Sequence, residues 1–208
     1  MIKQKYKTVF SIIFIGIALT VVSKSAKAQL FWIGGNAGMN ISWFTTPKID
    51  NAVVSSGVGH DIGFFLRYGK KPFYQIDFRW VRSNNTLSYE YEPGLVIEDE
   101  VPFHQFKIPI RVGYPIIYTP MFKWHVNGGP FLASTFLFST NTFEIERDDM
   151  RNPQFGVMGG TGIQFMNFII DVDYSYHITQ LFKGDEEDLG VDFDAHLQLI
   201  AVKVGFQF

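Results

Sequence analysis

The sequence has no cysteine among its 208 residues. A disulfide framework and a metal site built on thiolates are therefore excluded. The sequence also lacks an apolar run long enough for a transmembrane helix, which needs about 20 residues. Its longest apolar stretch, Val9 to Val22, is too short. Any attachment to a membrane must then come from another kind of structure.

Basic residues are scarce after the first 28 positions. Five of the 18 Lys and Arg residues precede Gln29, whereas all 20 acidic residues follow it. The remainder of the chain is therefore acidic, which argues against nucleic-acid binding because that function needs a basic surface. We expect no nucleic-acid partner.

The N-terminal stretch has the features of an export signal. Lys residues precede the apolar run Val9 to Val22, and Ala26-Lys27-Ala28 offers a cleavage site before Gln29. Because Gln29 is not Cys, no lipoprotein anchor is expected. We predict that residues 1–28 are a cleaved signal peptide and that residues 29–208 form one domain.

What the sequence has in abundance is aromatic residues and period-two alternation. Aromatic residues make up 17% of the chain, with 22 Phe. Apolar residues alternate with small or polar ones in eight segments, as in strands whose faces differ. The eight segments are 31–43, 57–68, 74–80, 105–114, 122–138, 154–165, 168–179 and 195–208. Their number and length are typical of a small membrane barrel, and none has the period of a helix.

The connections between these segments alternate in length. The short ones are 69–72, 115–120 and 166–167, and the long ones are 44–56, 83–102, 139–153 and 180–192. An up-and-down barrel has short turns at one end and long loops at the other. The pattern predicts an all-β, eight-stranded, antiparallel up-and-down transmembrane β-barrel, located in the bacterial outer membrane with both termini in the periplasm.

The polar faces of the segments are expected to point into the barrel. They are rich in glycine, and they carry charges of both signs, which can be buried only as pairs. The predicted interior polar network is Asp61, Arg67, Asp77, Arg79, Lys107, Arg111, Lys123, His125, Asp171, Asp173, His177 and Lys203. The expected cationic partners of Asp171 and Asp173 are Arg79, Lys107 and Arg111. With inward Trp32, Phe65, Phe131 and Met158, this set predicts a plugged lumen.

The last strand has a further expected role. Its outward residues end on an aromatic side chain, which resembles the signal that the outer-membrane assembly machinery recognises. The residues of this assembly signal are Val202, Val204, Phe206 and Phe208.

Several short motifs together resemble the PorT-like family of small outer-membrane β-barrels. They are the glycine-rich opening Gly34 to Ser42, Ile108-Pro109-Ile110, Gly128-Gly129-Pro130-Phe131, Gly156 to Gly162, and Asp173-Tyr174-Ser175-Tyr176. Lys107 departs from the family pattern, where an acid is common, and so does Asp173, where an arginine is expected. The resemblance implies the barrel fold and the outer membrane. It implies no defined activity for most members, and a role near protein secretion for the namesake.

Two groups of residues suggest chemistry less strongly. Asp173, Ser175 and His177 share a face but lie nearly 7 Å apart along a strand, too far for triad contacts. The outward His60, His104 and His196 have no matching serine and acid. We therefore expect no enzyme activity, no catalytic residues and no cofactor.

Acidic runs occupy the long loops. They are Glu98-Asp99-Glu100, Asp148-Asp149 and Asp185-Glu186-Glu187-Asp188. Clustered carboxylates suit Ca²⁺, but none of the runs has an EF-hand spacing, so solvated loop surface is the favoured interpretation. No metal site is predicted.

These observations predict a structural or interaction component of the cell envelope, including a subunit of a larger outer-membrane or secretion-related complex. The expected partners are outer-membrane lipid, the barrel assembly machinery and other envelope proteins. Two alternatives stay open, a narrow pore and an outer-membrane lipid-modifying enzyme.

Overall fold

The computed structural model describes residues 30–45, 48–49, 52–92, 95–137, 152–180 and 196–208. The predicted signal peptide, residues 1–28, lies outside these ranges, as do Phe138 and the acidic runs at 148–149 and 185–188. Across the described residues every regular element is a strand. No helix in that part of the chain is long and apolar enough to cross a membrane.

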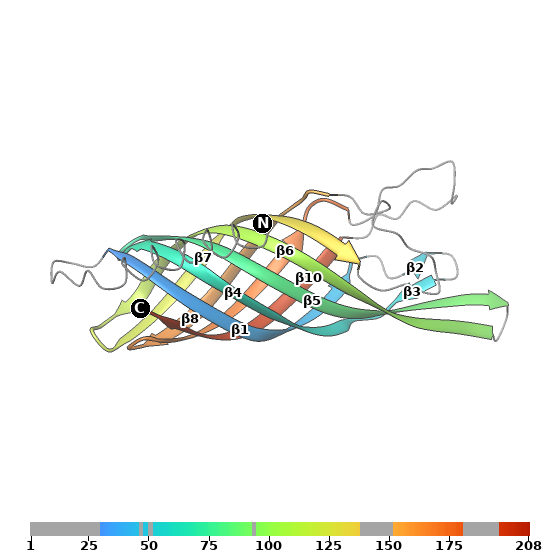
Figure 1. Cartoon of the computed structure of the whole chain (residues 1–208), viewed down its shortest axis with the longest axis horizontal. Coiled ribbons are helices and arrows are strands. Elements are labelled where there is room, and N and C mark those ends of the chain that lie inside the picture. Colours follow the sequence, from blue (N-terminus) through green and yellow to red (C-terminus); the bar gives the residue numbers. More distant parts are fainter. Residues whose placement is uncertain (1–29, 46–47, 50–51, 93–94, 138–151, 181–195) are drawn as a thin grey trace, which may run out of the picture.

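Eight strands form a closed antiparallel barrel (Figure 1). They are β1 (Phe31–Phe44), β4 (Gly57–Gly69), β5 (Phe73–Glu92), β6 (Leu95–Tyr118), β7 (Phe122–Leu137), β8 (Gln154–Phe165), β9 (Phe168–His177) and β10 (Leu197–Gln207). Each strand pairs with the next one along the chain, and β1 pairs with β10 to close the ring. The predicted eight-stranded up-and-down barrel is confirmed.

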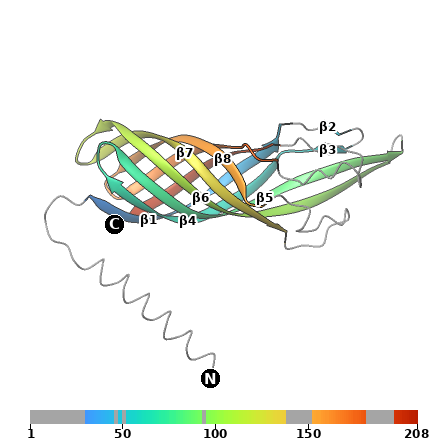
Figure 2. The same cartoon turned by 90° about the horizontal axis from the view of Figure 1, so that it is seen from above.

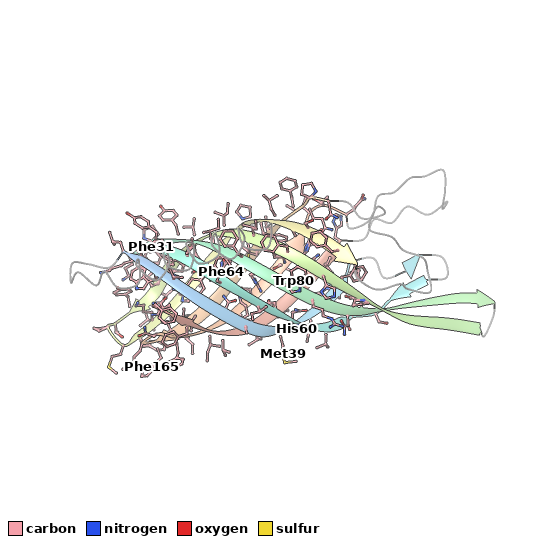
Figure 3. The ribbon with its side chains drawn as sticks, viewed as in Figure 1. Phe31, Met39, His60, Phe64, Trp80 and Phe165 are labelled. Carbon is pink, nitrogen blue, oxygen red and sulfur yellow. The ribbon has the colours of Figure 1, made fainter. Side chains whose placement is uncertain are left out.

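The alternation along each strand decides which side chains face outwards. Large apolar residues cover the outside of the barrel (Figure 3), among them Met39, Phe168 and Val204, which are 66%, 64% and 62% exposed. Polar and charged residues at the intervening positions are buried inside. A soluble barrel would have the opposite arrangement, so the exposed apolar band is the surface expected to meet lipid.

Short turns close one end of the barrel. They connect β4 to β5, β6 to β7 and β8 to β9, and the C-terminus lies at the same end (Figure 1). Gly69 begins the first of these turns with a φ of 92°, a conformation that favours glycine. β6 runs to Tyr118 with a shift of register between Pro115 and Ile117, so this turn is shorter than the predicted 115–120.

The opposite end carries a long hairpin that the sequence does not predict. The interpretation of residues 83–102 as a loop is wrong, because β5 continues to Glu92 and β6 starts at Leu95, with pairing from end to end. Both views show this β5–β6 hairpin extending past the rest of the barrel (Figures 1 and 2). The reason is physical: beyond the lipid neither face needs to be apolar, so the alternation fades while the backbone ladder continues.

Part of the predicted loop 44–56 is also strand. The short strands β2 (Lys48–Ile49) and β3 (Ala52–Val54) pair with each other, and β3 adds to the edge of β5 opposite residues 87–89. At residues 87–89 the hairpin is therefore part of a sheet that also includes β3 and β2. Such a sheet is more stable than an isolated pair of strands.

Candidate functional site

The interior of the barrel holds an unusual concentration of buried charge. Among the described side chains, nine charged residues are buried there. The five cations are Arg67, Arg79, Lys107, Arg111 and Lys203, and the four acids are Asp61, Asp77, Asp171 and Asp173. Lys123, the remaining cation of the predicted network, is only half-buried. Buried charges need partners, so the arrangement of the pairs defines the site.

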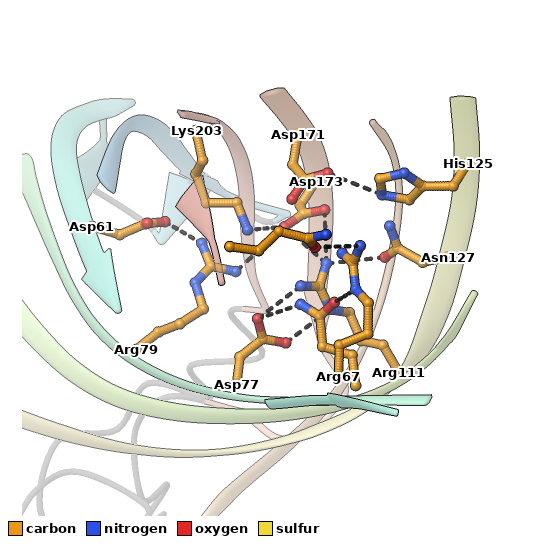
Figure 4. A network of polar contacts seen from close by, with 12 residues as sticks. Asp61, Arg67, Asp77, Arg79, Arg111, His125, Asn127, Asp171, Asp173 and Lys203 are labelled. Atoms are coloured by element: carbon orange, nitrogen blue, oxygen red, sulfur yellow. Dashed lines mark hydrogen bonds and ion pairs between the residues drawn. The ribbon is translucent and has the colours of Figure 1, made fainter. Parts of the chain in front are cut away.

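Asp173 on β9 is the centre of the network (Figure 4). Its carboxylate lies 3.5 Å from Arg79 Nη1 and 3.3 Å from Arg111 Nη1, both across the lumen, and it also accepts a hydrogen bond from Lys203 Nζ. One acid thus joins strands on opposite sides of the barrel. The predicted partners Arg79 and Arg111 are present, together with Lys203, which was not predicted as one.

A second acid on β5 completes the layer. Asp77 accepts two hydrogen bonds from Arg111, from Nε to Oδ2 and from Nη2 to Oδ1, each 2.8 Å long. This is the two-pronged geometry that makes arginine–carboxylate pairs strong. On the other side of the same layer, Asp61 on β4 accepts a hydrogen bond from Arg79.

The expected partners of Asp171 and Lys107 are wrong. Asp171 faces His125 on β7, with 3.1 Å between Oδ1 and Nε2, rather than an arginine. Lys107 makes no hydrogen bond among the described residues and places its ammonium 4.2 Å from the centre of the Phe131 ring. The cation is therefore stabilised by an aromatic face instead of a carboxylate.

Toward the short-turn end, a guanidinium lies in the lumen. Arg67 donates a hydrogen bond of 2.7 Å to Gln75, and its guanidinium lies 4.4 Å from the centre of the Phe73 ring. Lys123 lies at the same end, 5.8 Å from the Trp32 ring and 5.2 Å from the Tyr118 ring. Lys123 is thus part of the rim and not of the ion-pair layer.

Toward the hairpin end, neutral hydrogen bonds replace the ion pairs. Ser42 donates to Asn85 over 3.0 Å, and Ser83 donates to Asn40 over 3.1 Å. Thr135 accepts hydrogen bonds from Gln105 and Gln154, each 3.0 Å long. The sequence does not predict these hydrogen bonds, although the period-two alternation does show that each of the residues faces inwards. Side chains therefore occupy the lumen at the charged layer and on both sides of it, toward the short turns and toward the hairpin.

The residues considered for catalysis do not form a triad. His177 Nδ1 lies 2.9 Å from the Leu197 carbonyl, and the His177 ring packs edge-on against Phe131 at 4.8 Å. Ser175 Oγ makes no hydrogen bond in the described part of the chain. His60, His104 and His196 lie on the outer surface, as expected. Within the described residues, no group of three or more His, Asp and Glu side chains is arranged to hold a metal ion.

Two comparisons with known proteins support the barrel fold. A family model described as "Outer membrane protein beta-barrel domain" matches residues 25–183. Among solved structures, the outer membrane protein OprG of Pseudomonas aeruginosa is similar with a TM-score of 0.50 and 13% identity, covering 86% of this chain and 95% of OprG. Neisserial surface protein A is similar with a TM-score of 0.50 and 15% identity, covering 86% and 97%. No curated protein matches the chain in sequence. At these identities the structural likeness concerns the fold alone.

Proposed function

Because the chain belongs to the family of outer membrane protein beta-barrel domains, we propose that it acts as a plugged anchor in the outer membrane. In this role the barrel conducts no solute and carries out no chemistry, and its purpose is to present the β5–β6 hairpin to other envelope components. The narrow pore and the lipid-modifying enzyme are the competing functions.

The observation that carries the proposal is the charged layer across the lumen. Asp173 contacts Arg79, Arg111 and Lys203, which come from three other strands, and all four side chains are at most 1% exposed. A barrel of eight strands is only wide enough for side chains to fill. A solute would have to separate these pairs inside a medium of low dielectric constant, which costs several kcal/mol per ion.

Planar-bilayer recording of the purified protein tests the anchor against the pore. We expect no steady single-channel steps, with a known porin in the same lipid as the positive control. Reproducible openings in the wild-type protein would overturn the anchor and favour the pore.

For orientation, we propose that the hairpin end faces the outside of the cell and that both termini lie in the periplasm. The short turns and the C-terminus share one end of the barrel, and short turns face the periplasm in outer-membrane barrels. Cysteine placed at Lys70 in a short turn and, separately, at position 93 between β5 and β6 tests this. In intact cells, an impermeant maleimide should label only the second.

For biogenesis, we propose that residues 1–28 are removed during export and that Val202, Val204, Phe206 and Phe208 are read by the barrel assembly machinery. The first three follow the outward period of β10, and Phe208 is 64% exposed. N-terminal sequencing of the protein isolated from outer membranes tests the cleavage, which should leave Gln29 as the first residue.

The interaction role is the part of the proposal that names a class of partner. A paired hairpin presents a fixed surface, which is better suited to binding a protein than a disordered loop of equal length. The PorT-like resemblance adds a secretion-related complex as one such setting. Affinity isolation in mild detergent should recover envelope proteins with the wild-type chain and lose them when residues 86–100 are replaced by a short turn.

The enzyme alternative has little support in the site. Ser175 and His177 are buried in the lumen, where lipid cannot reach them, and Ser175 Oγ forms no hydrogen bond with His177. The purified protein should leave phospholipid and lipid A chemically unchanged when mass spectrometry compares them before and after incubation.

A further inference from the structure

A pocket opens at the short-turn end of the lumen. Its walls include Trp32 and Arg67, which are register partners on β1 and β4. They also include Lys123 on β7 with its register partners Tyr118 and Gln164 on β6 and β8. The volume of the pocket, counting the part open to solvent, is about 340 Å³. This lies at the lower end of the range for ligand sites, about 300–1,000 Å³, so the pocket suits one small group. We call it the turn-end pocket.

Basic side chains surround the turn-end pocket at different depths. Of the cations that line it, Arg67 is 6% exposed, Lys123 is half-buried and Lys70 is exposed. Lys71 lies next to Lys70 in the same turn. Its ammonium is 5.3 Å from the centre of the Tyr118 ring, and that of Lys123 is 5.2 Å from the same ring. The cations therefore form a path from the solvent into the lumen.

Acidic residues are missing from this end of the chain's described part. Residues 66–76, 111–125 and 162–170 contain the three short turns and the strand ends beside them, and they include no Asp or Glu. Residues 1–29, which precede β1 and lie outside the described ranges, include none either. Like charges gathered around one opening repel one another, and an anion between them removes that repulsion.

Two carboxylates come nearest to being partners for these cations. Asp171 faces His125, which also lines the pocket, with 3.1 Å between Oδ1 and Nε2. That carboxylate approaches from the side of the charged layer and is itself buried. The C-terminal carboxylate of Phe208 is at the short-turn end, but Phe208 does not line the pocket. Every residue that lines the pocket is thus basic or uncharged.

The two deeper cations keep donors that could bind an anion. Arg67 uses Nε for a hydrogen bond to Gln75 and Nη1 for a long one of 3.5 Å to Gln207, whereas its Nη2 donates to no described residue. Lys123 forms no hydrogen bond or ion pair among the described residues, and its ammonium faces only the rings of Trp32 and Tyr118. Charge-assisted hydrogen bonds from guanidinium and ammonium groups to a carboxylate are strong ones.

We propose that the turn-end pocket binds a carboxylate of an acidic peptide segment in a partner protein. One carboxylate fits between Arg67 and Lys123, and further acids of the same segment reach the exposed Lys70 and Lys71. The walls are inward side chains, so the pocket opens along the barrel axis and away from the lipid, which favours a peptide over a lipid headgroup. Under the orientation proposed above, on which this assignment of side rests, the segment is periplasmic.

Fluorescence anisotropy of the purified protein in a neutral detergent tests the proposal. The probe is an amidated peptide of alternating glutamate and glycine that carries a neutral dye, and the matched control has glutamine in place of glutamate. The glutamate peptide should bind about tenfold more tightly or better, as expected for hydrogen bonds between charged groups. In about 1 M salt, where screening is strong, most of the difference should vanish. Equal binding of the two peptides would overturn the proposal.

Variants then locate the binding. K123Q should lose most of the preference for the glutamate peptide, and K70Q with K71Q should lose part of it. R82Q removes a cation that does not line the pocket and should bind as the wild type does. A heat-modifiable gel shift should show that each variant is folded. The double variant changes only exposed residues, so it keeps the test decisive if K123Q fails to fold. Unchanged binding in the folded variants would contradict the assignment of the site.

Glycerol phosphate separates a peptide site from a headgroup site. It has the phosphate of a lipid headgroup without acyl chains, and it cannot reach the pocket and the exposed lysines together. It should therefore compete weakly, and displacement of the glutamate peptide at equal concentration would replace the peptide by a headgroup as the ligand. Detergent micelles have no sidedness, so a failure of the proposed orientation or of the anchor role leaves these results unaffected.

Discussion

Gly160 on β8 lies opposite Asp173 on β9, and a Cβ atom on Gly160 would come within 2.3 Å of Asp173 Oδ1. The acid at the centre of the lumen therefore occupies the volume that a side chain at position 160 would need. The next inward pair repeats the relationship, since a Cβ on Gly162 would lie 1.9 Å from Asp171 Oδ1. The absence of side chains at these two glycines of β8 thus leaves the space that two acids of β9 occupy.

Gly160→Ala should destabilise the barrel by about 1–3 kcal/mol, the usual cost of overpacking. The added methyl group would also lie 2.6 Å from the Val172 carbonyl oxygen, which is backbone and cannot rotate away. Urea titration of the protein refolded into lipid vesicles measures the free energy of unfolding. Gly159→Ala is the control on the same strand, because its nearest neighbour would be 3.8 Å away. Equal costs at the two positions would contradict the steric explanation.

Asp173→Ala should cost about 3–5 kcal/mol, the range for removing one partner of a buried ion pair. Arg79, Arg111 and Lys203 would remain in the lumen with one carboxylate fewer between them. The same titration measures this, with Ser175→Ala as a buried control on the same face of β9. Planar-bilayer recordings of Asp173→Ala should still show no channel, since the bulky side chains that fill the lumen are unchanged.

Lys107→Met should leave stability unchanged or increase it by about 1 kcal/mol. Lys107 contacts an aromatic ring and forms no ion pair with an acid among the described residues, and replacing a buried charge by an apolar group of similar shape is often neutral or stabilising. Lys203→Met is the contrast, because it removes a partner of Asp173 and should destabilise. A loss above about 2 kcal/mol in Lys107→Met would mean that the ammonium has a partner of real importance.

Val202→Arg should cost about 2–4 kcal/mol, as for arginine placed near the middle of a bilayer. Val202 is 51% exposed, and its register partners Met39 and Val172 are also exposed apolar residues. Ile178→Arg, beyond the end of β9, should cost about 1 kcal/mol or less because the penalty falls near the interface. Refolding titrations into vesicles measure both. Similar penalties at the two depths would contradict the proposed lipid-facing band.

Phe208→Ser should slow assembly in cells while leaving export intact. We expect signal-processed protein to accumulate unfolded in the periplasm, seen as loss of the heat-modifiable band on gels. Met166→Ser, at another exposed apolar residue near the same end of the barrel, is the control. Normal assembly of the Phe208 variant would remove this residue from the proposed assembly signal.

The fold could be predicted because a membrane imposes a strict rule on every spanning strand. Lipid on one side and a packed lumen on the other require alternation, so the eight spanning segments and their inward positions are readable from residues such as Ile170 and Asp171. The alternating lengths of the connections then predict that consecutive strands are neighbours in an up-and-down barrel. Beyond the lipid this rule no longer applies, and for residues 83–102 the sequence predicts a loop where the structure has a hairpin. A weaker signal was present there in the alternation of Leu87, Tyr89 and Tyr91 before Pro93-Gly94.

The pairing inside the lumen could not be predicted in the same way. The period-two alternation along β9 places Asp171 and Asp173 inside the barrel. The stagger between strands decides which side chains meet across the lumen. Because of that stagger, Asp171 pairs with His125, and the Lys107 ammonium lies against the Phe131 ring.

The β5–β6 hairpin has a mechanical consequence. β5 carries Asp77 and Arg79, and β6 carries Lys107 and Arg111, so both strands pass without a break from the charged layer to the residues outside the barrel. A load applied at the tip runs along the strands, and many ladder hydrogen bonds share it in shear instead of opening one at a time. The root of the hairpin therefore lies at the level of the charged layer, so a force on the tip would be transmitted to the wall of the barrel.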